Sequence, residues 1–478
     1  MPRIMKVLAT ARPGSEESAS VAWSMRDGAN FHRRPLRRVR ALAAGGSRWA
    51  AAIAVAALSW GCRGEDVTVT GAVGRGVEPT PYAPSSDASA RANRPGEFAS
   101  PAAGDGASDL AEQLELACGA GLLTNAGRDQ IARRPYIQNV SSTSAAILFT
   151  TREPRTEATL RVTEPAGVTR DVATELDAAD ATGRQRRALL RGLRPATVYC
   201  YQLLDWTEPV GFRTAPAPGT SAGVRFIAFG DSGGESRELV RHEMDAVSFD
   251  LMLHVGDIAY MRGTLSEFES TFFDTYAGLI AHFPIFAASG NHEHYTSDAA
   301  PYREVFELPD NGAPYGTERW FSFDWGDIHF VALDTERVGA EQAEWLERDL
   351  SLTSLGWKIV YMHKPPFSSG AHGSSMDVRE AFSPLFERFG VQLVLAGHDH
   401  DYERTLPIGG VTYIVTGGGG FGLRVVGTSD FTAHSEATFH IVYGELQGNT
   451  LWLRALGTSG EVIDSTRIAR DRGLEEPR

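Results

Sequence analysis

The chain has 478 residues, of which 42% are hydrophobic and 22% are charged, and this globular composition excludes a wholly disordered or fibrous protein. Its three cysteines are too few for a disulfide-dense scaffold or for a zinc site built from thiolates alone. The formal net charge of −14 argues against nucleic acid as a stable partner.

Residues 1–62 are predicted to be an export signal. Arginines between Arg33 and Arg48 precede an apolar stretch, Trp49–Trp60, that is too short to span a membrane as a stable helix. The stretch ends at Gly61-Cys62, which resembles a bacterial lipoprotein processing site, and an ordinary secretory signal cut nearby is the alternative. We therefore expect an exported protein that is periplasmic, anchored in the outer membrane through a lipid on Cys62, or secreted.

Residues 63–120 are predicted to be a disordered tether. The segment is rich in Pro, Ala, Ser and Gly, and it has too little apolar surface to offset the entropy of ordering it. Cys118 at its end and Cys200 further on are the other two cysteines. An exported chain permits a disulfide between them, and two free thiols are the alternative.

Residues 130–216 are predicted to be an all-β sandwich. Short alternating runs such as Ala145–Thr150 and Ala158–Val162 are typical of strands separated by turns. The segment Thr197-Val198-Tyr199-Cys200-Tyr201 follows a turn with proline, and it resembles a corner of a fibronectin-III-like sandwich in which a tyrosine hydroxyl ties a strand to the preceding turn. An antiparallel sandwich of another kind is the alternative, and either would be a support without chemistry of its own.

Residues 222–470 are predicted to be an α/β domain, because apolar runs alternate with amphipathic helical stretches. The runs expected to be strands are Val224–Phe229, Asp250–Val255, Pro284–Ser289, Trp357–Met362 and Val391–Ala396. The stretches expected to be helices are Arg237–Phe249, Ser266–His282, Ala340–Leu350 and Val378–Phe389. In such sheets the ligand site lies beyond the carboxyl ends of the strands.

Polar residues follow all five of these strands. They are Asp231, Asp257, Tyr260, Asn291, His292, His363, His398 and His400. A single Gly-Asp pair is often only a turn, and a single histidine at a strand is often a hydrogen-bonded core residue, as we expect for His254. Five such strand ends at one edge of one predicted sheet, all with oxygen or nitrogen donors, instead indicate a metal site.

These segments carry a family resemblance over roughly residues 134–445. Gly230-Asp231-Ser232-Gly233, Gly256-Asp257-Ile258-Ala259-Tyr260, Gly290-Asn291-His292-Glu293, Val360-Tyr361-Met362-His363 and Gly397-His398-Asp399-His400 resemble, in order, the five blocks of the calcineurin-like metallophosphoesterases. Tyr260, the run Asp399–Arg404 and the preceding sandwich resemble the purple acid phosphatase branch. The resemblance implies a fibronectin-III-like domain followed by a four-layer α/β/β/α metallophosphoesterase domain.

The resemblance also implies a ligand set for two metal ions. One ion would take Asp231, Tyr260 and His400, the other would take Asn291, His363 and His398, and Asp257 would bridge them. A phenolate with carboxylates suits Fe(III), and an amide oxygen with two imidazoles suits a divalent ion such as Zn, Fe or Mn. By the same resemblance His292 contacts the phosphate and protonates the leaving oxygen. His372 is a second substrate-facing candidate, and an exposed loop histidine is its alternative.

The function implied is that of a binuclear-metal acid phosphatase, which hydrolyses phosphate monoesters by attack of a metal-bound hydroxide. Its partner would be a phosphate ester substrate, and it would contact a membrane only through the N-terminal lipid. Two alternatives stay open at this point. The same metals could serve a phosphodiesterase or nucleotidase, or the chain could be a non-catalytic, tethered surface-binding protein.

Overall fold

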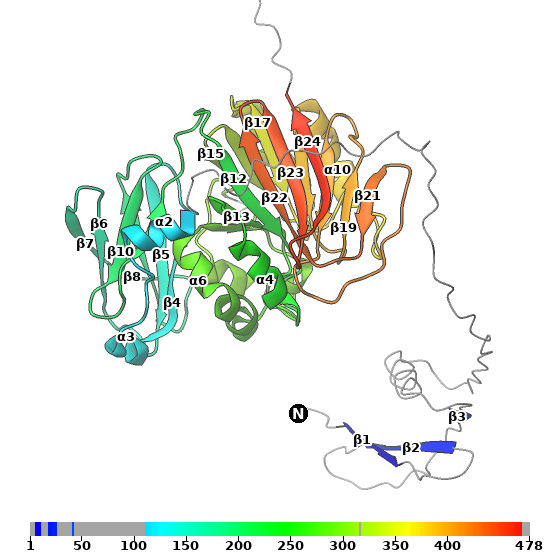
Figure 1. The fold of residues 1–478 in the computed structure, drawn as a ribbon, viewed down its shortest axis with the longest axis horizontal. Coiled ribbons are helices and arrows are strands. Elements are labelled where there is room, and N and C mark those ends of the chain that lie inside the picture. The colour runs from blue at the N-terminus through cyan, green and yellow to red at the C-terminus, as the bar shows by residue number, and fades with distance from the viewer. Residues whose placement is uncertain (1–4, 11–17, 26–40, 43–109, 315–316, 471–478) are drawn as a thin grey trace, which may run out of the picture. The chain divides into compact units, whose positions relative to one another are not determined.

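The structure is a computed structural model that describes residues 5–10, 18–25, 41–42, 110–314 and 317–470 (Figure 1). The chain divides into two compact units, residues 1–98 and 99–478. In the first unit, β1 (Met5–Thr10), β2 (Ser18–Met25) and β3 (Ala41–Leu42) form an antiparallel sheet. The apolar stretch 49–60, Cys62 and residues 63–109 of the expected tether lie outside the described residues, so the export signal stays a prediction. Within the described part, no helix is long and apolar enough to cross a membrane.

The second unit begins with two antiparallel sheets of four strands each. One sheet has the order β4 (Ile131–Gln138), β5 (Ser144–Thr151), β9 (Gln185–Arg191) and β8 (Glu175–Leu176). The other has the order β11 (Val210–Arg213), β10 (Val198–Leu203), β6 (Thr159–Thr163) and β7 (Thr169–Ala173). The hydroxyl of Tyr199 accepts a hydrogen bond from the backbone N–H of Arg194 at 2.9 Å, and so ties β10 to the preceding turn. The relation of this region to fibronectin III domains stays a prediction.

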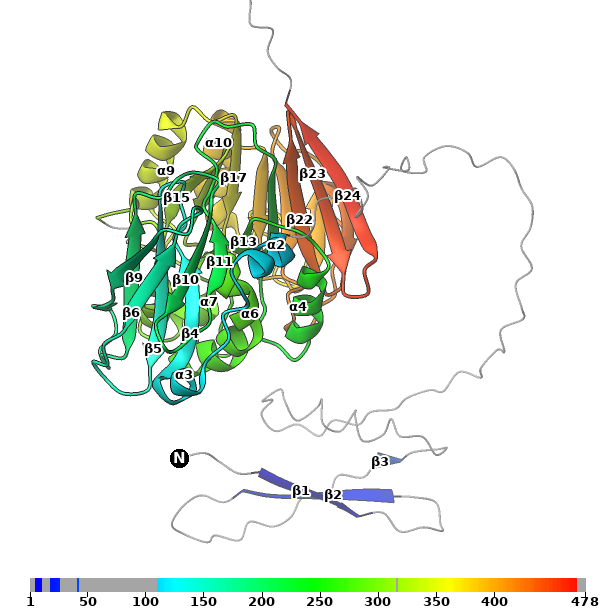
Figure 2. The same cartoon turned by 60° about the vertical axis from the view of Figure 1, so that its left-hand side comes forward.

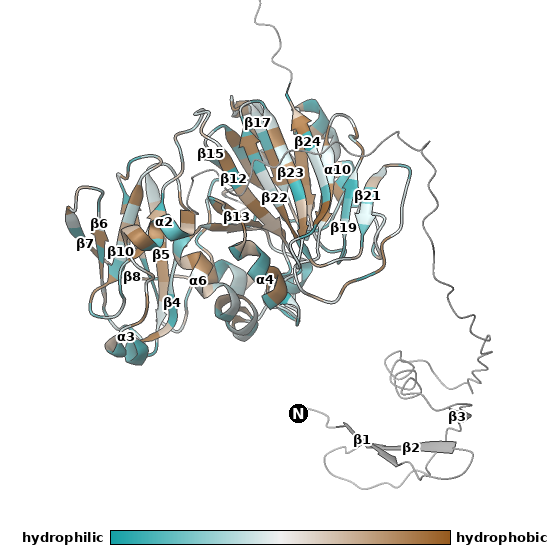
Figure 3. Cartoon of the chain, viewed as in Figure 1, coloured by the Kyte–Doolittle hydropathy of each residue, from teal (hydrophilic) through white to brown (hydrophobic). Residues whose placement is uncertain are grey.

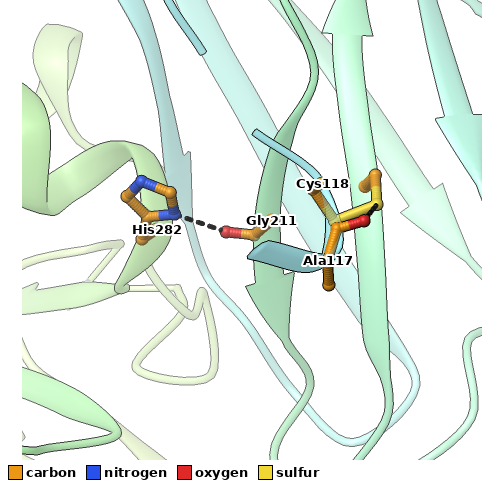
Figure 4. Close-up of a disulfide and its surroundings, with 5 residues drawn as sticks. Ala117, Cys118, Gly211 and His282 are labelled. Atoms are coloured by element: carbon orange, nitrogen blue, oxygen red, sulfur yellow. Dashed lines mark hydrogen bonds between the residues drawn. A yellow bond between two sulfur atoms is a disulfide. The ribbon is translucent and has the colours of Figure 1, made fainter. Parts of the chain in front are cut away.

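The tether prediction is wrong for residues 110–120. Helix α2 (Leu110–Ala117) buries Leu110 and Leu114, which are four residues apart and so lie on one face. A disulfide joins Cys118, directly after the helix, to Cys200 on β10, with 5.5 Å between the Cα atoms (Figure 4). The composition of the segment hid this short helix, because two leucines and one cysteine are enough to fix it to the sandwich. A second short helix, α3 (Asn125–Gln130), leads into β4.

Two further sheets form the α/β domain, as the four-layer α/β/β/α arrangement implied by the resemblance requires, whereas the strand pattern alone suggested a single sheet. The first has the order β14 (Ile285–Ala287), β13 (Leu251–His254), β12 (Val224–Phe229), β22 (His440–Gln447), β23 (Thr450–Gly457) and β24 (Val462–Ala469). The second has the order β15 (Phe321–Trp325), β16 (Ile328–Ala332), β17 (Trp357–Tyr361), β18 (Leu393–Ala396), β20 (Thr412–Thr416), β19 (Tyr402–Thr405) and β21 (Thr432–Glu436). The five strands expected from the sequence are thus split between the two sheets.

The two sheets pack face to face between layers of helices (Figures 1 and 2). Ile359 and Tyr361 of β17 belong to the core shared with the first sheet, whereas Val360 belongs to a second core. Helices α9 (Ala340–Leu352) and α10 (Met376–Arg388) bury their apolar residues in that second core. Helix α4 (Arg237–Asp245) packs against β22 and β23 of the first sheet, and strands β12 and β13 are mainly apolar (Figure 3).

Further short helices among the described residues belong to the α/β domain. They are α5 (Leu265–Glu267), the π-helix η1 (Phe268–Phe273), α6 (Asp274–His282), α7 (Asn291–His294) and α8 (Ala300–Val305). Of these, α6 and α8 contact the sandwich. The buried hydroxyls of Tyr136 and Tyr201 donate to the backbone carbonyls of Val305 and Ala281, at 2.7 and 2.8 Å. Nδ1 of His282, at the end of α6, lies 2.9 Å from the carbonyl of Gly211 on β11 (Figure 4). Because these buried polar groups are paired, the sandwich is held against α6 and α8.

Candidate metal centre

All the predicted ligands lie where the carboxyl ends of strands from both sheets meet. Asp231 follows β12, Asp257 and Tyr260 follow β13, and Asn291 begins α7 directly after β14. From the second sheet, His363 follows β17, and His398 and His400 follow β18. Parallel strands from two packed sheets therefore deliver every donor to one edge of the domain, as the strand-end pattern predicts.

Asp231, Asp257, Tyr260 and His400 form the first half of the cluster. The hydroxyl of Tyr260 lies 3.0 Å from Oδ1 of Asp231 and 3.1 Å from Oδ2 of Asp257. Nε2 of His400 lies 3.4 Å from both the Tyr260 hydroxyl and Oδ1 of Asp231. All four residues are buried, so their donor atoms face one another rather than solvent.

His363 connects this half to a second one. Its Nε2 lies 3.2 Å from Oδ2 of Asp257, 3.1 Å from Oδ1 of Asn291 and 3.2 Å from Nδ1 of His398. Ligand atoms of Asp257, His363 and His398 all lie within 4.8 Å of one another, which is close enough to hold one metal ion. Asp257 thus contacts both halves through the same carboxylate oxygen.

The backbone is strained where it presents these side chains. Asp231, Asp257 and His398 have φ values of 57°, 54° and 72°, in the left-handed region that residues with a Cβ seldom adopt. Glycines make room beside them, since a Cβ on Gly290 would lie 2.2 Å from Oδ1 of Asp257 and one on Gly397 would lie 2.5 Å from Oδ2 of Asp231. Strain of this kind gathers at functional sites, where the surrounding structure enforces it.

A fully buried carboxylate, that of Glu293, holds the Asp257 turn in place. Its two oxygens accept hydrogen bonds from the backbone N–H groups of Asp257, Ile258, Ala259 and Gly290, all between 2.8 and 3.0 Å. The turn is therefore fixed by a side chain from the Asn291 segment. Glu293 is therefore a structural support of the site, behind the donors that face the cluster.

The imidazole rings are oriented by backbone carbonyls. Nδ1 of His363 lies 3.0 Å from the carbonyl of Val255, and Nδ1 of His400 lies 2.7 Å from that of Gly422. A carbonyl oxygen can only accept, so each Nδ1 carries a proton and Nε2 is the nitrogen that faces the cluster, where it can bind a metal ion once its own proton is displaced.

His254, by contrast, is a histidine whose two ring nitrogens both have hydrogen-bond partners outside the cluster. Its Nδ1 accepts from the backbone N–H of Gly256 at 3.1 Å, and its Nε2 pairs with the Ser232 hydroxyl at 2.8 Å. The expectation that His254 is a hydrogen-bonded core residue is confirmed.

The charges of the cluster suit a cation. Burial lowers the pKa of His363, but the neighbouring Asp257 carboxylate outweighs it and raises this pKa to about 10. Burial, together with the carboxylates of Asp231 and Asp257, raises the pKa of Tyr260 well above its ordinary value. The site therefore concentrates negative charge that protons alone must balance, and a metal ion would displace those protons. The donor set fits the two-metal assignment chemically.

His292 lies beside the cluster with one nitrogen free. Its backbone N–H donates to Oδ1 of Asp257 at 2.9 Å, and its Nδ1 lies 2.8 Å from the carbonyl of Met261. That carbonyl requires a proton on Nδ1, so Nε2 is the nitrogen that faces the site, 3.7 Å from Oδ2 of Asp257. The side chain is 16% exposed, which leaves it accessible to a substrate.

His372 lies at the other side of the cluster, held by a residue that sequence reasoning missed. Its ring stacks on that of His398 at 4.1 Å between centroids. Oδ1 of Asp399, a fully buried carboxylate, lies 3.0 Å from Nδ1 of His372 and accepts from its backbone N–H at 2.7 Å. Asp399 lies within the Gly397-His398-Asp399-His400 motif, so the sequence places it near the site. The sequence does not show that Asp399 contacts His372.

Comparisons with known proteins agree with this geometry. Residues 224–402 match the family of calcineurin-like phosphoesterases. Over 355 residues the chain is 27% identical to "Probable inactive purple acid phosphatase 1" of Arabidopsis thaliana, a match that covers 59% of this chain and 57% of the relative. It is also 27% identical to a nucleotide pyrophosphatase/phosphodiesterase of Hordeum vulgare, covering 56% of this chain and 88% of that one. The chain thus spans little more than half the length of the Arabidopsis relative.

Among solved structures, the purple acid phosphatase from yellow lupin (Lupinus luteus) seeds superposes with a TM-score of 0.63 and 22% identity. The match covers 71% of this chain and 74% of the lupin chain, and at this identity it establishes the fold alone. The family match, the relatives and the shared fold agree: residues 224–402 match a calcineurin-like metallophosphoesterase domain, and purple acid phosphatases are among the relatives of the chain.

Proposed function

We propose that this protein hydrolyses phosphate monoesters at a binuclear metal centre. The observation that carries the proposal is the position of Asp257, whose Oδ2 lies 3.1 Å from the Tyr260 hydroxyl and 3.2 Å from Nε2 of His363. One carboxylate therefore stands between two sets of donors, as a bridging ligand must. Two metal ions held close together stabilise both the attacking and the leaving oxygen of a phosphoryl displacement.

The assignment of ligands follows the two halves of the cluster. Asp231, Tyr260 and His400 would hold one ion, Asn291, His363 and His398 would hold the other, and Asp257 would serve both. The phenolate favours Fe(III) in the first position, and the second suits Zn, Fe or Mn in the divalent state. When bound, the ions would activate water and neutralise the charge of the phosphate.

His292 supplies the proton in this proposal. Because its Nδ1 donates to the Met261 carbonyl, Nε2 is the nitrogen that faces the site, and in the imidazolium form it can donate to the oxygen of the departing alcohol. His372 stands beside the phosphate position with its ring stacked on His398, and Asp399 orients that ring through Nδ1. Both histidines act from outside the ligand set, so their loss need not remove metal.

The decisive experiment is an assay of the full chain with p-nitrophenyl phosphate, with and without a chelator, together with metal analysis. We expect close to two metal ions per chain and turnover that the chelator abolishes. His242→Gln, which alters an exposed histidine on α4, should match the wild type. A pure protein that binds two metal ions and turns over no phosphate ester would reject the proposal and favour a non-catalytic role, as the name of the Arabidopsis relative suggests for that protein.

A second candidate is a phosphodiesterase or nucleotide pyrophosphatase that uses the same metals. It is supported by the barley relative, of which the chain covers 88%. Bis(p-nitrophenyl) phosphate separates the two candidates, because a monoesterase should turn it over far more slowly than p-nitrophenyl phosphate.

We also propose that the protein works outside the cytoplasm. The Cys118–Cys200 disulfide supports this location, because such bonds persist in oxidising compartments.

A further inference from the structure

Arg424 is a cation at the edge of the candidate metal centre that the proposed function does not use. It lies in the loop between β20 and β21, and its backbone N–H donates to the carbonyl of His400 at 3.1 Å. Its Nη1 lies 2.8 Å from Nδ1 of His372 and also contacts Nε2 of that ring. Since His372 stacks on His398, a single imidazole separates the guanidinium from the ligand cluster.

The guanidinium of Arg424 stands apart from the carboxylates of the described part of the chain. Among those residues, no Asp or Glu oxygen lies within 4.0 Å of it, whereas His372, His400 and Arg404 each have a carboxylate partner. Lys364, the cation next to His363, differs in this respect, because its Nζ pairs with Glu336 at 2.6 Å. A partly exposed arginine without a counter-ion, next to a site built for a phosphate, is available to bind a further anion.

The contact of Arg424 with His372 leaves most N–H donors of the guanidinium free. The Nδ1–H of His372 donates to Asp399, so in the neutral imidazole only the Nε2 lone pair can accept from Arg424. A guanidinium has five N–H donors in a planar fork, and this fork matches the geometry of a phosphate bidentately. The histidine therefore orients the arginine and leaves donors free on it.

We propose that Arg424 forms a subsite for a second phosphate group of the substrate, next to the phosphate that is hydrolysed. The substrate class is then a compound with two neighbouring phosphates, either a simple phosphoanhydride or a nucleoside diphosphate. This inference rests on the proposed function, because the first phosphate is taken to lie at the metal ions. Arg424 acts in it as a specificity residue and not as a participant in the chemistry.

Binding measurements on the metal-loaded full chain test the subsite without depending on turnover. Calorimetric titrations would compare inorganic phosphate with methylenediphosphonate and with α,β-methylene-ADP, neither of which can be cleaved at its P–C–P linkage. The variants are Arg424→Ala, Arg424→Lys, and the control Arg348→Ala, which removes an exposed arginine from helix α9. The diphosphonate reports on a simple phosphoanhydride, and the ADP analogue reports on a nucleotide.

We expect Arg424→Ala to lower the ratio of diphosphonate to phosphate affinity by about 10-fold to 100-fold, the range for a lost hydrogen bond to a charged group. Arg424→Lys should fall between Ala and wild type, because lysine keeps the charge and loses the fork. A larger effect on the ADP analogue than on the diphosphonate would assign the subsite to nucleotides, and equal effects would assign it to phosphoanhydrides in general.

The outcomes separate this inference from the proposed function. If all three anions bind and Arg424→Ala leaves the affinity ratio unchanged, the subsite is rejected while the metal centre stands. If the ratio falls in a protein that hydrolyses no phosphate ester, the subsite stands and the proposed function is rejected. If neither phosphate nor either analogue binds the metal-loaded protein, both are rejected.

Discussion

Buried imidazoles contact carboxylates at β16 and in the candidate centre, and only the second of these sites suits a metal. On β16, His329 lies between two carboxylates, with Nδ1 at 2.7 Å from Asp324 and Nε2 at 2.8 Å from Asp349. In the candidate centre, His363 has one carboxylate partner, Asp257, at 3.2 Å. The residue types are the same, so the difference must come from what each ring nitrogen faces.

At β16 each ring nitrogen of His329 is held by one carboxylate, so the ring forms an ion pair and presents neither nitrogen to a shared cluster of donors. In the centre, a backbone carbonyl takes Nδ1 of His363, and Nε2 faces Asn291 and His398 as well as Asp257. Several donors that converge on one point, each oriented from behind, can bind a cation. A histidine surrounded by carboxylates on both sides instead forms a structural ion pair.

The strongest test of this contrast changes the shared carboxylate. Asp257→Asn removes a charge that both halves of the centre contact, so we expect loss of both metal ions and of turnover. The loss of rate should exceed the about 10²–10⁴-fold that a general acid contributes. Metal content and kcat are measured together, with Asp245→Asn on helix α4 as the control. A variant that keeps two metals and a near-normal rate would disprove the binuclear arrangement.

The second test concerns His292, which lies beside the ligands without belonging to them. His292→Ala should keep both metals and lower kcat by about 10²–10⁴-fold on alkyl phosphates. The loss should be much smaller on p-nitrophenyl phosphate, because a phenol of low pKa departs without a proton. Equal losses on both substrates would assign His292 to positioning of the phosphate, and loss of a metal would make it a ligand.

A third test addresses the support behind Asp257. Glu293→Gln replaces a carboxylate that accepts from four backbone N–H groups with an amide whose NH2 group cannot accept. We expect metal affinity to fall by about 10-fold to 100-fold, as for other residues that orient ligands. Competition with a chelator measures it, and Glu344→Gln on α9 is the matched control. Unchanged affinity would mean that the turn keeps its shape without Glu293.

The ligand cluster could be predicted from the sequence because each donor directly follows an apolar strand. Asp257 and His363 are 106 positions apart, yet the rule that strand ends meet at one edge predicts their contact. The division into two sheets was not predictable from the strand pattern, since buried strands of one sheet or of two are equally apolar. Arg424 was also missed, because it lies in a glycine-rich loop whose path depends on tertiary contacts and not on a local pattern.

The last test turns to the other region, where the proton itself supports the fold. Burial lowers the pKa of His329, but Asp324 and Asp349 outweigh it and raise this pKa to about 9, compared with about 6.5 in an unfolded chain. The folded state therefore holds a proton that the unfolded state has lost between these two pH values. The stabilisation is complete below about pH 6.5 and disappears as the pH rises through 9, and it amounts to about 3 kcal/mol at most.

The variant His329→Gln tests this, because glutamine cannot take up the proton. Its free energy of unfolding, measured with urea in the presence of a chelator, should thus fall less than that of the wild type between pH 6.5 and 9. The chelator removes the contribution of metal binding, which has its own pH dependence. If the two proteins lose stability in parallel over this range, the ion pair at β16 contributes nothing through its proton, and the contrast between the two histidine sites would have to rest on geometry alone.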